Sequence, residues 1–230
     1  HVLLVDVGDT IQGSSLESVH QSSVRAGKTE SPDPMMLAMS RMGYDAMVLG
    51  NHELNFGLEN LAAARKAASF PWLSANTTGA SPPFAPYRVK TVGGVKVAVI
   101  GVTTSAIPQW EKPEHIRGLA WMAPEEGVRR ALAALEHETP DVVLAAVHGG
   151  LDRDPATGER RPGELPGENP AWSIAEQFPQ LAAIVYGHTH RREEGLRVNG
   201  VLLVQPRNWA MEVARIDISL AREPGGPWKV

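Results

Sequence analysis

Four short stretches of this sequence carry side chains that bind divalent metal ions in proteins. They are Gly8-Asp9, Gly50-Asn51-His52-Glu53, His148-Gly149-Gly150 and Gly187-His188-Thr189-His190. Their donors are carboxylate and amide oxygens and imidazole nitrogens, and the 230 residues contain no cysteine. Such a set suits Mn, Zn, Fe, Ni or Co without selecting one of them. An aspartate can bridge two ions, and paired ions about 3.5–4 Å apart promote displacement at phosphorus.

Each stretch follows an apolar run that predicts a buried strand. We predict core strands near residues 2–7, 45–50, 71–75, 142–147 and 182–186. Helices are predicted near 33–43, 57–68 and 124–138, with a shorter one after Asn169-Pro170. Because the carboxyl ends of strands in an α/β sheet meet at one edge, we expect the four stretches to lie close together.

Antiparallel strands are also predicted. Gly93-Gly94 separates 85–92 from 95–102, which is typical of a hairpin. Alternating patterns at 196–198, 201–205 and 211–219 predict three more strands. The chain is therefore predicted to have an α/β fold with mixed sheets. Residues 152–168, rich in proline, glycine and charge, predict one long exposed loop.

The placement of the histidines favours a metal site. Four of the eight histidines follow a predicted core strand directly: His52, His148, His188 and His190. Each residue alone has another explanation, since Asp9 could cap a helix and His148 could be an ordinary hydrogen-bonded histidine. Asn51 and Glu53 could form a turn. Their joint occurrence at four strand ends favours metal ligation over these alternatives.

The composition is that of a globular chain without a basic surface. The hydrophobic content is 43%, the formal net charge is −4, and the Lys and Arg residues are scattered. We therefore expect no nucleic-acid polymer as a partner. No apolar run approaches the roughly 18 residues of a transmembrane segment, and these residues contain no signal peptide. The sequence makes no prediction of the oligomeric state.

The four stretches, in this order, resemble the motifs of the calcineurin-like metallophosphoesterases. The longer strings DTIQGSSL, GYDAMVLGNHELNFGLENL, PWLSAN and YGHTH look most like one branch of the 5'-nucleotidase family, the 2',3'-cyclic-nucleotide 2'-phosphodiesterase/3'-nucleotidases. The resemblance runs through nearly the whole chain. It implies a four-layer α/β/β/α sandwich, hydrolysis of a small-molecule nucleotide phosphoester, and a location in the periplasm or outside the cell. A 5'-nucleotidase is the alternative enzyme.

The resemblance also implies a role for each motif residue. Asp9 would bridge two divalent metal ions, and His190 would serve one of them. Three residues would complete the shell of the other ion: Asn51, His148 and His188. His52 would face the phosphate as the acid that protonates or stabilises the leaving oxygen.

The chain departs from the family pattern at its start. The family carries an Asp-x-His motif on the strand before Gly8-Asp9, and no Asp-x-His occurs in the 230 residues. We therefore expect one catalytic domain over residues 1–230, missing its first strand, as a fragment of a longer chain. The second ion would keep only Asp9 and His190, too few ligands for a tight site. The competing interpretation is a degenerate domain that binds metal without catalysis.

Two further features remain open. Asn55 stands where the 5'-nucleotidase branch carries Asp, so its carbonyl would orient His52 with a weaker electrostatic effect, or it would merely cap the following helix. Arg153, Arg160 and Arg161 in the long loop would reach a substrate or simply form a solvated charged loop. The C-terminal nucleotide-binding domain of the family has no counterpart in these residues, so no base preference is predicted.

Overall fold

The computed structural model describes residues 2–28, 31–81, 83–223, 226 and 228–229. Within these residues the strands form two main sheets and one small sheet. The three-stranded sheet is parallel, in the order β1 (Val5–Asp6), β2 (Ala46–Val48), β3 (Trp72–Leu73). The small sheet pairs β4 (Thr77–Thr78) with β7 (Ala120–Trp121).

The six-stranded sheet has a parallel centre and antiparallel edges. Its order is β10 (Glu193–Val198), β11 (Val201–Gln205), β9 (Ala183–Tyr186), β8 (Val142–His148), β6 (Val95–Thr103), β5 (Tyr87–Val92). The four central strands pair in parallel, whereas β10 and β5 pair antiparallel with their neighbours. The predicted α/β fold with mixed sheets is confirmed, as is the predicted hairpin around Gly93-Gly94.

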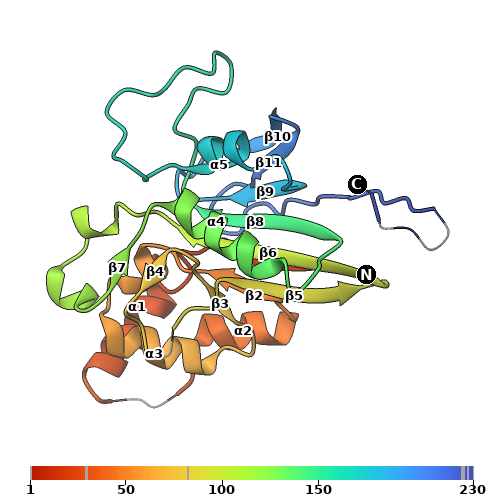
Figure 1. The fold of residues 1–230 in the computed structure, drawn as a ribbon. Coiled ribbons are helices and arrows are strands. Elements are labelled where there is room, and N and C mark those ends of the chain that lie inside the picture. Colours follow the sequence, from red (N-terminus) through yellow and green to blue (C-terminus); the bar gives the residue numbers. More distant parts are fainter. Residues whose placement is uncertain (1, 29–30, 82, 224–225, 227, 230) are drawn as a thin grey trace.

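Helices cover the outer sides of the two sheets. They are α1 (Ser15–Arg25), α2 (Pro34–Met42), α3 (Leu58–Ala67), α4 (Pro124–Leu135) and α5 (Ala171–Gln177). Figure 1 shows α1, α2 and α3 grouped beside the three-stranded sheet, whereas α4 and α5 lie against the six-stranded sheet. Short 3-10 turns at His52–Leu54, Ile107–Gln109 and Pro113–Ile116 complete the helical elements of the described chain.

Three apolar clusters separate these layers. One lies between the two sheets, where Val48 and Leu73 of the smaller sheet meet Val99 and Ala146 of the larger one. The other two lie between each sheet and its helices, and they use the alternate residues of the same strands. Because successive side chains of a strand point to opposite faces, each sheet is buried on both faces. This burial explains the continuous apolar runs in the sequence.

Two elements differ from the sequence predictions. Helix α1 was not predicted from the sequence. In the structure, the side chain of Ser14 accepts the Glu17 N–H at 3.1 Å and begins the helix as an N-cap residue. The strand predicted at 211–219 is wrong, because these residues form no strand. Their burial alternates along the chain, which explains the pattern, but no described segment pairs with them. An apolar pattern with a period of two residues indicates that alternate side chains are exposed. It does not indicate that a neighbouring strand is present.

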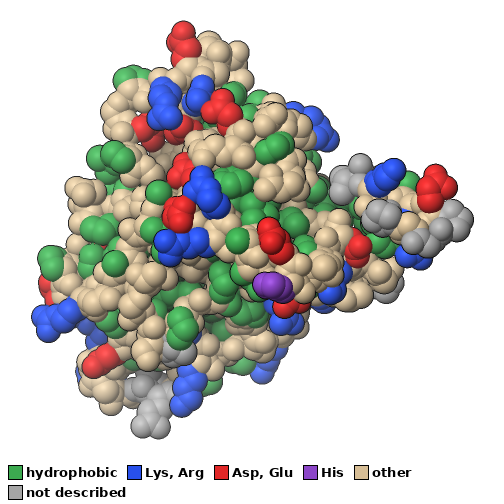
Figure 2. All heavy atoms as spheres, viewed as in Figure 1, with side chains coloured by type: hydrophobic (Ala, Val, Ile, Leu, Met, Phe, Trp, Pro, Cys, Tyr) green, Lys and Arg blue, Asp and Glu red, His purple; other side chains and the backbone are tan. Residues whose placement is uncertain are grey.

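The surface carries charges of both signs. On the face shown in Figure 2, Lys and Arg side chains are interspersed with Asp and Glu side chains, and apolar side chains lie between them. Among the described residues, no helix is long and apolar enough to cross a membrane.

The loops that follow β1 and β2 pack backbone against backbone. A Cβ atom added to Gly50 would lie 2.4 Å from both N and Oδ1 of Asp9. A Cβ atom added to Gly8 would lie 2.7 Å from N of Gly50 and 2.9 Å from Nδ1 of His148. Only residues without a side chain permit this approach, so the two glycines set how closely the strand ends can meet.

We expect Gly50→Ala to lower the free energy of unfolding by about 3 kcal/mol or more, because the methyl group would overlap the Asp9 backbone. Gly94→Ala, in the turn between β5 and β6, is the matched control. An added Cβ there meets nothing within 4 Å, so only the backbone strain of about 1–2 kcal/mol is expected. Urea unfolding of both variants measures this difference, and equal losses would contradict the close approach.

Candidate functional site

The four predicted stretches meet at one edge of the molecule, but they come from two sheets. Asp9 and Asn51 follow β1 and β2 of the three-stranded sheet. In the six-stranded sheet, His148 is the last residue of β8 and His188 follows β9. The two sheets present their carboxyl ends at the same edge because the cluster between them packs them face to face. The predicted convergence is therefore confirmed for these four residues.

The backbone at this edge is strained. Asp9, His188 and His190 have positive φ angles of 66°, 74° and 53°. A left-handed conformation costs a non-glycine residue on the order of 1–3 kcal/mol, and such residues gather at functional sites. Three residues of the candidate set thus adopt a conformation that side-chain sterics disfavour.

His148 is the buried centre of the group. Its side chain is 1% exposed, and Nδ1 donates to the carbonyl oxygen of Val7 at 2.7 Å. Nε2 lies 2.9 Å from Oδ1 of Asn51 and 3.2 Å from Oδ2 of Asp9. One ring nitrogen therefore faces two oxygen acceptors, so a proton or a metal ion must lie between these atoms. A histidine held at one nitrogen by a backbone carbonyl is the usual arrangement of a metal ligand.

His188 completes a three-residue group. Asp9, His148 and His188 each offer a donor atom, and these atoms all lie within 4.8 Å of one another. The His188 ring centre lies 5.0 Å from that of His148 and 5.5 Å from that of Trp110, which stacks on it. Together with the Asn51 amide oxygen, the group offers two oxygens and two nitrogens. This donor set fits a divalent transition metal ion.

His190 lies outside that group. Its side chain is exposed, with Nδ1 3.3 Å from Nδ2 of Asn208 and the ring edge-on to Trp209 at 6.0 Å. The described residues therefore bring together the ligands predicted for one ion and leave His190 apart. Its assignment to a second ion stays a prediction.

The charges of the group shift its pKa values. Burial disfavours a charge on His148, but the Asp9 carboxylate outweighs this and raises the pKa of His148 to about 9. Burial also disfavours the charge on Asp9, yet His148 lowers the pKa of Asp9 to about 2. Burial and the charge of His148 lower the pKa of His188 to about 4. Near neutral pH, Asp9 and His148 are thus both charged, and His188 is neutral.

Glu53 ties the loops after β1 and β2 together. Its carboxylate is fully buried, and Oε2 accepts the N–H groups of Asp9 at 2.8 Å and of Gly50 at 2.7 Å. Oε1 accepts the N–H groups of Thr10 and Ile11. Burial raises the pKa of Glu53 to about 7, and the charge of Asp9 adds to this shift. Glu53 is therefore more than a turn residue, because its side chain fixes the backbone that positions Asp9.

His52 lies beside the group and is oriented by side chains. Its backbone N–H donates to Oδ1 of Asp9 at 2.9 Å, and its ring nitrogen Nδ1 lies 2.6 Å from Oδ1 of Asn55. Asn55 donates in turn from Nδ2 to Oε2 of Glu111 at 2.5 Å. The alternative in which Asn55 caps the next helix is wrong, because the N-cap of α3 is Gly57 and no side chain caps it.

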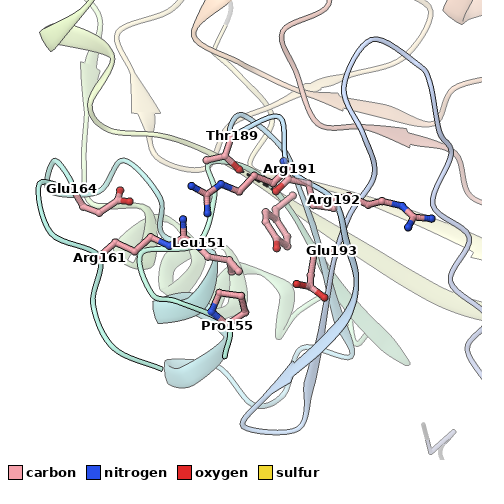
Figure 3. A pocket seen from close by; sticks show the side chains of 10 residues that line it. Leu151, Pro155, Arg161, Glu164, Thr189, Arg191, Arg192 and Glu193 are labelled. Carbon is pink, nitrogen blue, oxygen red and sulfur yellow. Dashed lines mark hydrogen bonds between the residues drawn. The ribbon is translucent and has the colours of Figure 1, made fainter. Parts of the chain in front are cut away.

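A separate cavity of about 270 Å³ lies between residues 152–168 and strand β10 (Figure 3). Its lining includes Arg161, Glu164, Arg191 and Glu193, so its walls carry both signs of charge. Thr189 reaches its edge and hydrogen-bonds to Gln205 at 3.1 Å. The cavity is not lined by the metal-type donors.

The three arginines of the loop 152–168 contact residues of the same loop or of the neighbouring helix α5. Arg153 pairs with Glu176 of α5 at 2.9 Å, and Arg160 lies 3.8 Å from Asp152. Arg161 donates from Nε to the carbonyl oxygen of Arg153 at 3.2 Å. These contacts agree with the interpretation of a charged surface loop. The loop does bring one residue to the site that the sequence predictions lack, Glu168, whose Oε1 lies 3.9 Å from Nε2 of His188.

Comparisons with known proteins agree with this site. The family model of the calcineurin-like phosphoesterases matches residues 1–192. A 5'-nucleotidase of Vibrio cholerae serotype O1 is 32% identical over 90% of this chain and 41% of its own length. A 2',3'-cyclic-nucleotide 2'-phosphodiesterase/3'-nucleotidase of Salmonella typhimurium is 27% identical over 99% of this chain and 37% of its own. The two relatives carry the two activities that the sequence left open.

A solved structure extends the match to the fold. The calcineurin-like phosphoesterase YfkN from Bacillus subtilis superposes with a TM-score of 0.80 and 27% identity, over 99% of this chain and 74% of that one. The chain spans about two fifths of the length of the two curated relatives. The family model covers well over half of the chain, including the four strands β1, β2, β8 and β9 that carry the site residues. The chain therefore belongs to the calcineurin-like metallophosphoesterases, in the family of the 5'-nucleotidases and 2',3'-cyclic-nucleotide phosphodiesterases.

Proposed function

We propose that this chain is the catalytic domain of a metal-dependent enzyme that hydrolyses nucleotide phosphoesters. The observation that supports it is the convergence of Asp9, His148 and His188 on one point, with the Asn51 oxygen beside them. We further propose the 2',3'-cyclic-nucleotide 2'-phosphodiesterase/3'-nucleotidase branch, on the motif strings and on Asn55. The Vibrio relative supports the alternative, a 5'-nucleotidase.

The residues of the group fit one divalent ion, whether Mn, Zn, Fe, Ni or Co. Four residues would hold it: Asp9, Asn51, His148 and His188. Such an ion, when bound, activates water and neutralises phosphate oxygens. A second ion would share Asp9 and use His190, together with an Asp-x-His motif on a strand before β1. That strand would complete a four-layer α/β/β/α sandwich, and the family resemblance supports a location in the periplasm or outside the cell.

The chain's own residues contribute orientation and a proton. The Val7 carbonyl fixes the ring of His148, and Glu53 fixes the backbone of Asp9, so both donors are held before any ion arrives. Nδ1 of His52 donates to Oδ1 of Asn55, so the charged ring would carry its transferable proton at Nε2. Among the described residues, none hydrogen-bonds to that nitrogen. Nε2 is therefore available to protonate or stabilise the leaving oxygen.

The pKa values of the group predict how the metal-free protein takes up an ion. At about pH 8, Asp9 is ionised and His188 is neutral, whereas His148 still holds its Nε2 proton because its pKa is raised to about 9. Ligation requires the lone pair of Nε2, so each ion bound should release about one proton. Affinity should therefore rise with pH up to about pH 9 and level off above it.

Calorimetric titration of the chelator-treated protein with Mn at about pH 8 measures this release, using buffers of different ionisation enthalpy. Binding without a dependence on the buffer would contradict the assignment of His148 as a ligand.

The substrate class is tested with 2',3'-cyclic AMP, 3'-AMP and 5'-AMP in the presence of Mn. We expect hydrolysis of the first two to exceed that of 5'-AMP. His148→Asn should remove at least about 99% of the rate, because it removes a ligand from the buried centre of the site. His137→Asn, at an exposed position after α4, is the control and should keep the full rate. No hydrolysis of any ester would favour the degenerate domain, and hydrolysis of 5'-AMP alone would favour the 5'-nucleotidase.

The role of His52 is tested by comparing the rate loss of a His52 variant on two esters with different leaving groups. We expect His52→Ala to lower kcat on 3'-AMP by about 100-fold with little change in KM, since a general acid acts in the transition state. An ester of nitrophenol, whose leaving group needs no proton, should lose much less. Equal losses on both esters would contradict the role of His52 as the acid.

A further inference from the structure

A chain of partly buried side chains runs outward from His52. Nδ1 of His52 lies 2.6 Å from Oδ1 of Asn55, whose Nδ2 donates to Oε2 of Glu111 at 2.5 Å. The other oxygen of Glu111 accepts the N–H of Lys112 at 2.8 Å and bonds Nδ1 of His115 at 2.8 Å. The family resemblance gives roles to His52 and Asn55 and leaves Glu111 and His115 without one.

The direction of these bonds is fixed by Glu111. An ionised carboxylate only accepts hydrogen bonds, so it can face only the NH₂ side of the Asn55 amide. The amide oxygen must then face His52, and a carbonyl oxygen can only accept. Nδ1 of His52 is therefore the nitrogen that holds a hydrogen, in both the neutral and the charged ring.

The low exposure of the Glu111 and His115 side chains supports this arrangement of hydrogen bonds. The Glu111 side chain is 7% exposed and that of His115 is 13% exposed, although Glu111 lies between two 3-10 turns at the surface and His115 within the second of them. A carboxylate removed from water needs hydrogen-bond donors, and three converge on it here. The segment 107–116 thus holds the Glu111 carboxylate in a fixed position against the NH₂ group of the Asn55 amide.

We propose that Glu111 is a positioning residue for the proposed reaction, which holds the Asn55 amide in the one orientation that keeps the proton on Nδ1 of His52. The inference rests on the proposed role of His52. Its consequence is that Nε2 becomes the nitrogen that exchanges a proton with the leaving oxygen. With the amide reversed, its NH₂ group would face Nδ1, and the charged ring could not form without two donors meeting.

Glu111→Gln tests the direction of the amide. The Lys112 N–H is always a donor, so the new glutamine must turn its oxygen to Lys112 and its NH₂ group to Asn55. The Asn55 amide should then reverse, and neutral His52 should move its hydrogen from Nδ1 to Nε2. Two-bond proton–nitrogen spectra of the metal-free protein, above the titration range of histidine, distinguish the two tautomers. His52→Ala identifies the signals.

Asn55→Asp and the double variant provide a rescue that a structural role would not produce. The new carboxylate would face Glu111 across a contact of 2.5 Å, and like charges at that distance repel, so Asn55→Asp alone should lose activity. In Asn55→Asp with Glu111→Gln, the glutamine donates to the new aspartate, which again accepts from Nδ1 of His52. The oxygen facing His52 is restored, although both residues differ from the native pair.

The expected kinetic results follow from these bonds. Each single variant should lower kcat by about 10-fold with KM nearly unchanged, and the double variant should return to within about 3-fold of the native kcat. Glu114→Gln, an exposed residue of the same segment, is the matched control and should change neither kcat nor the tautomer. Thermal unfolding of all variants shows whether each one folds.

Two results would overturn the proposal. One is a Glu111→Gln variant that folds and keeps the Nδ1 tautomer of His52. The other is a double variant no more active than the two single ones. The tautomer is measured without metal or substrate, so it tests the positioning role even if the protein hydrolyses none of the nucleotides. A native protein without activity would then contradict the proposed function alone.

Discussion

The candidate site depends on one buried carboxylate, that of Glu53, which accepts four backbone N–H groups from two different loops. Three of them belong to the turn after β1 and the fourth to Gly50 after β2. Hydrogen bonds to a charged acceptor are among the stronger ones, and when Glu53 is ionised, above its raised pKa of about 7, they act together on a short backbone segment. They offset the strain of the positive φ at Asp9 and turn its side chain toward His148. These four bonds, the Glu53 clamp, fix the backbone of Asp9, while the backbone N–H of His52 and Nε2 of His148 contact its carboxylate.

The clamp works because the two sheets can approach without side chains between their loops. Gly8 and Gly50 leave no room for a Cβ atom, and Nδ1 of His148 binds the Val7 carbonyl within the same contact. Asp9, Asn51 and His148 are therefore placed by hydrogen bonds of the folded chain, and His188 lies between the rings of Trp110 and His148. The exposed His190 has no comparable support, which is the physical reason that it stands apart from the group. The architecture prepares one metal position more completely than a second.

The sequence predicted the site better than it predicted the contacts that hold it. Apolar runs ending in Asp9, Asn51, His148 and His188 are local patterns, and their convergence follows from the geometry of sheets. Glu111 could not be found in this way, because it lies 56 positions from Asn55 and no periodicity links them. Helix α1 did have a local signal in Ser14 and Glu17. The segment 211–219 shows the opposite error, since an alternating pattern cannot reveal whether a partner strand exists.

The arrangement around His52 separates two properties that a single carboxylate would combine. A carboxylate in direct contact with Nδ1 would orient the ring and place a full negative charge against it. Here the neutral amide of Asn55 orients the ring, while the charge of Glu111 stays one side chain further out and is partly balanced by its own three donors. Because Coulomb energy falls with distance, orientation is retained while the charge felt at His52 is weakened. In the proposed reaction of an anionic phosphoester, that separation would also keep a second negative charge away from the substrate.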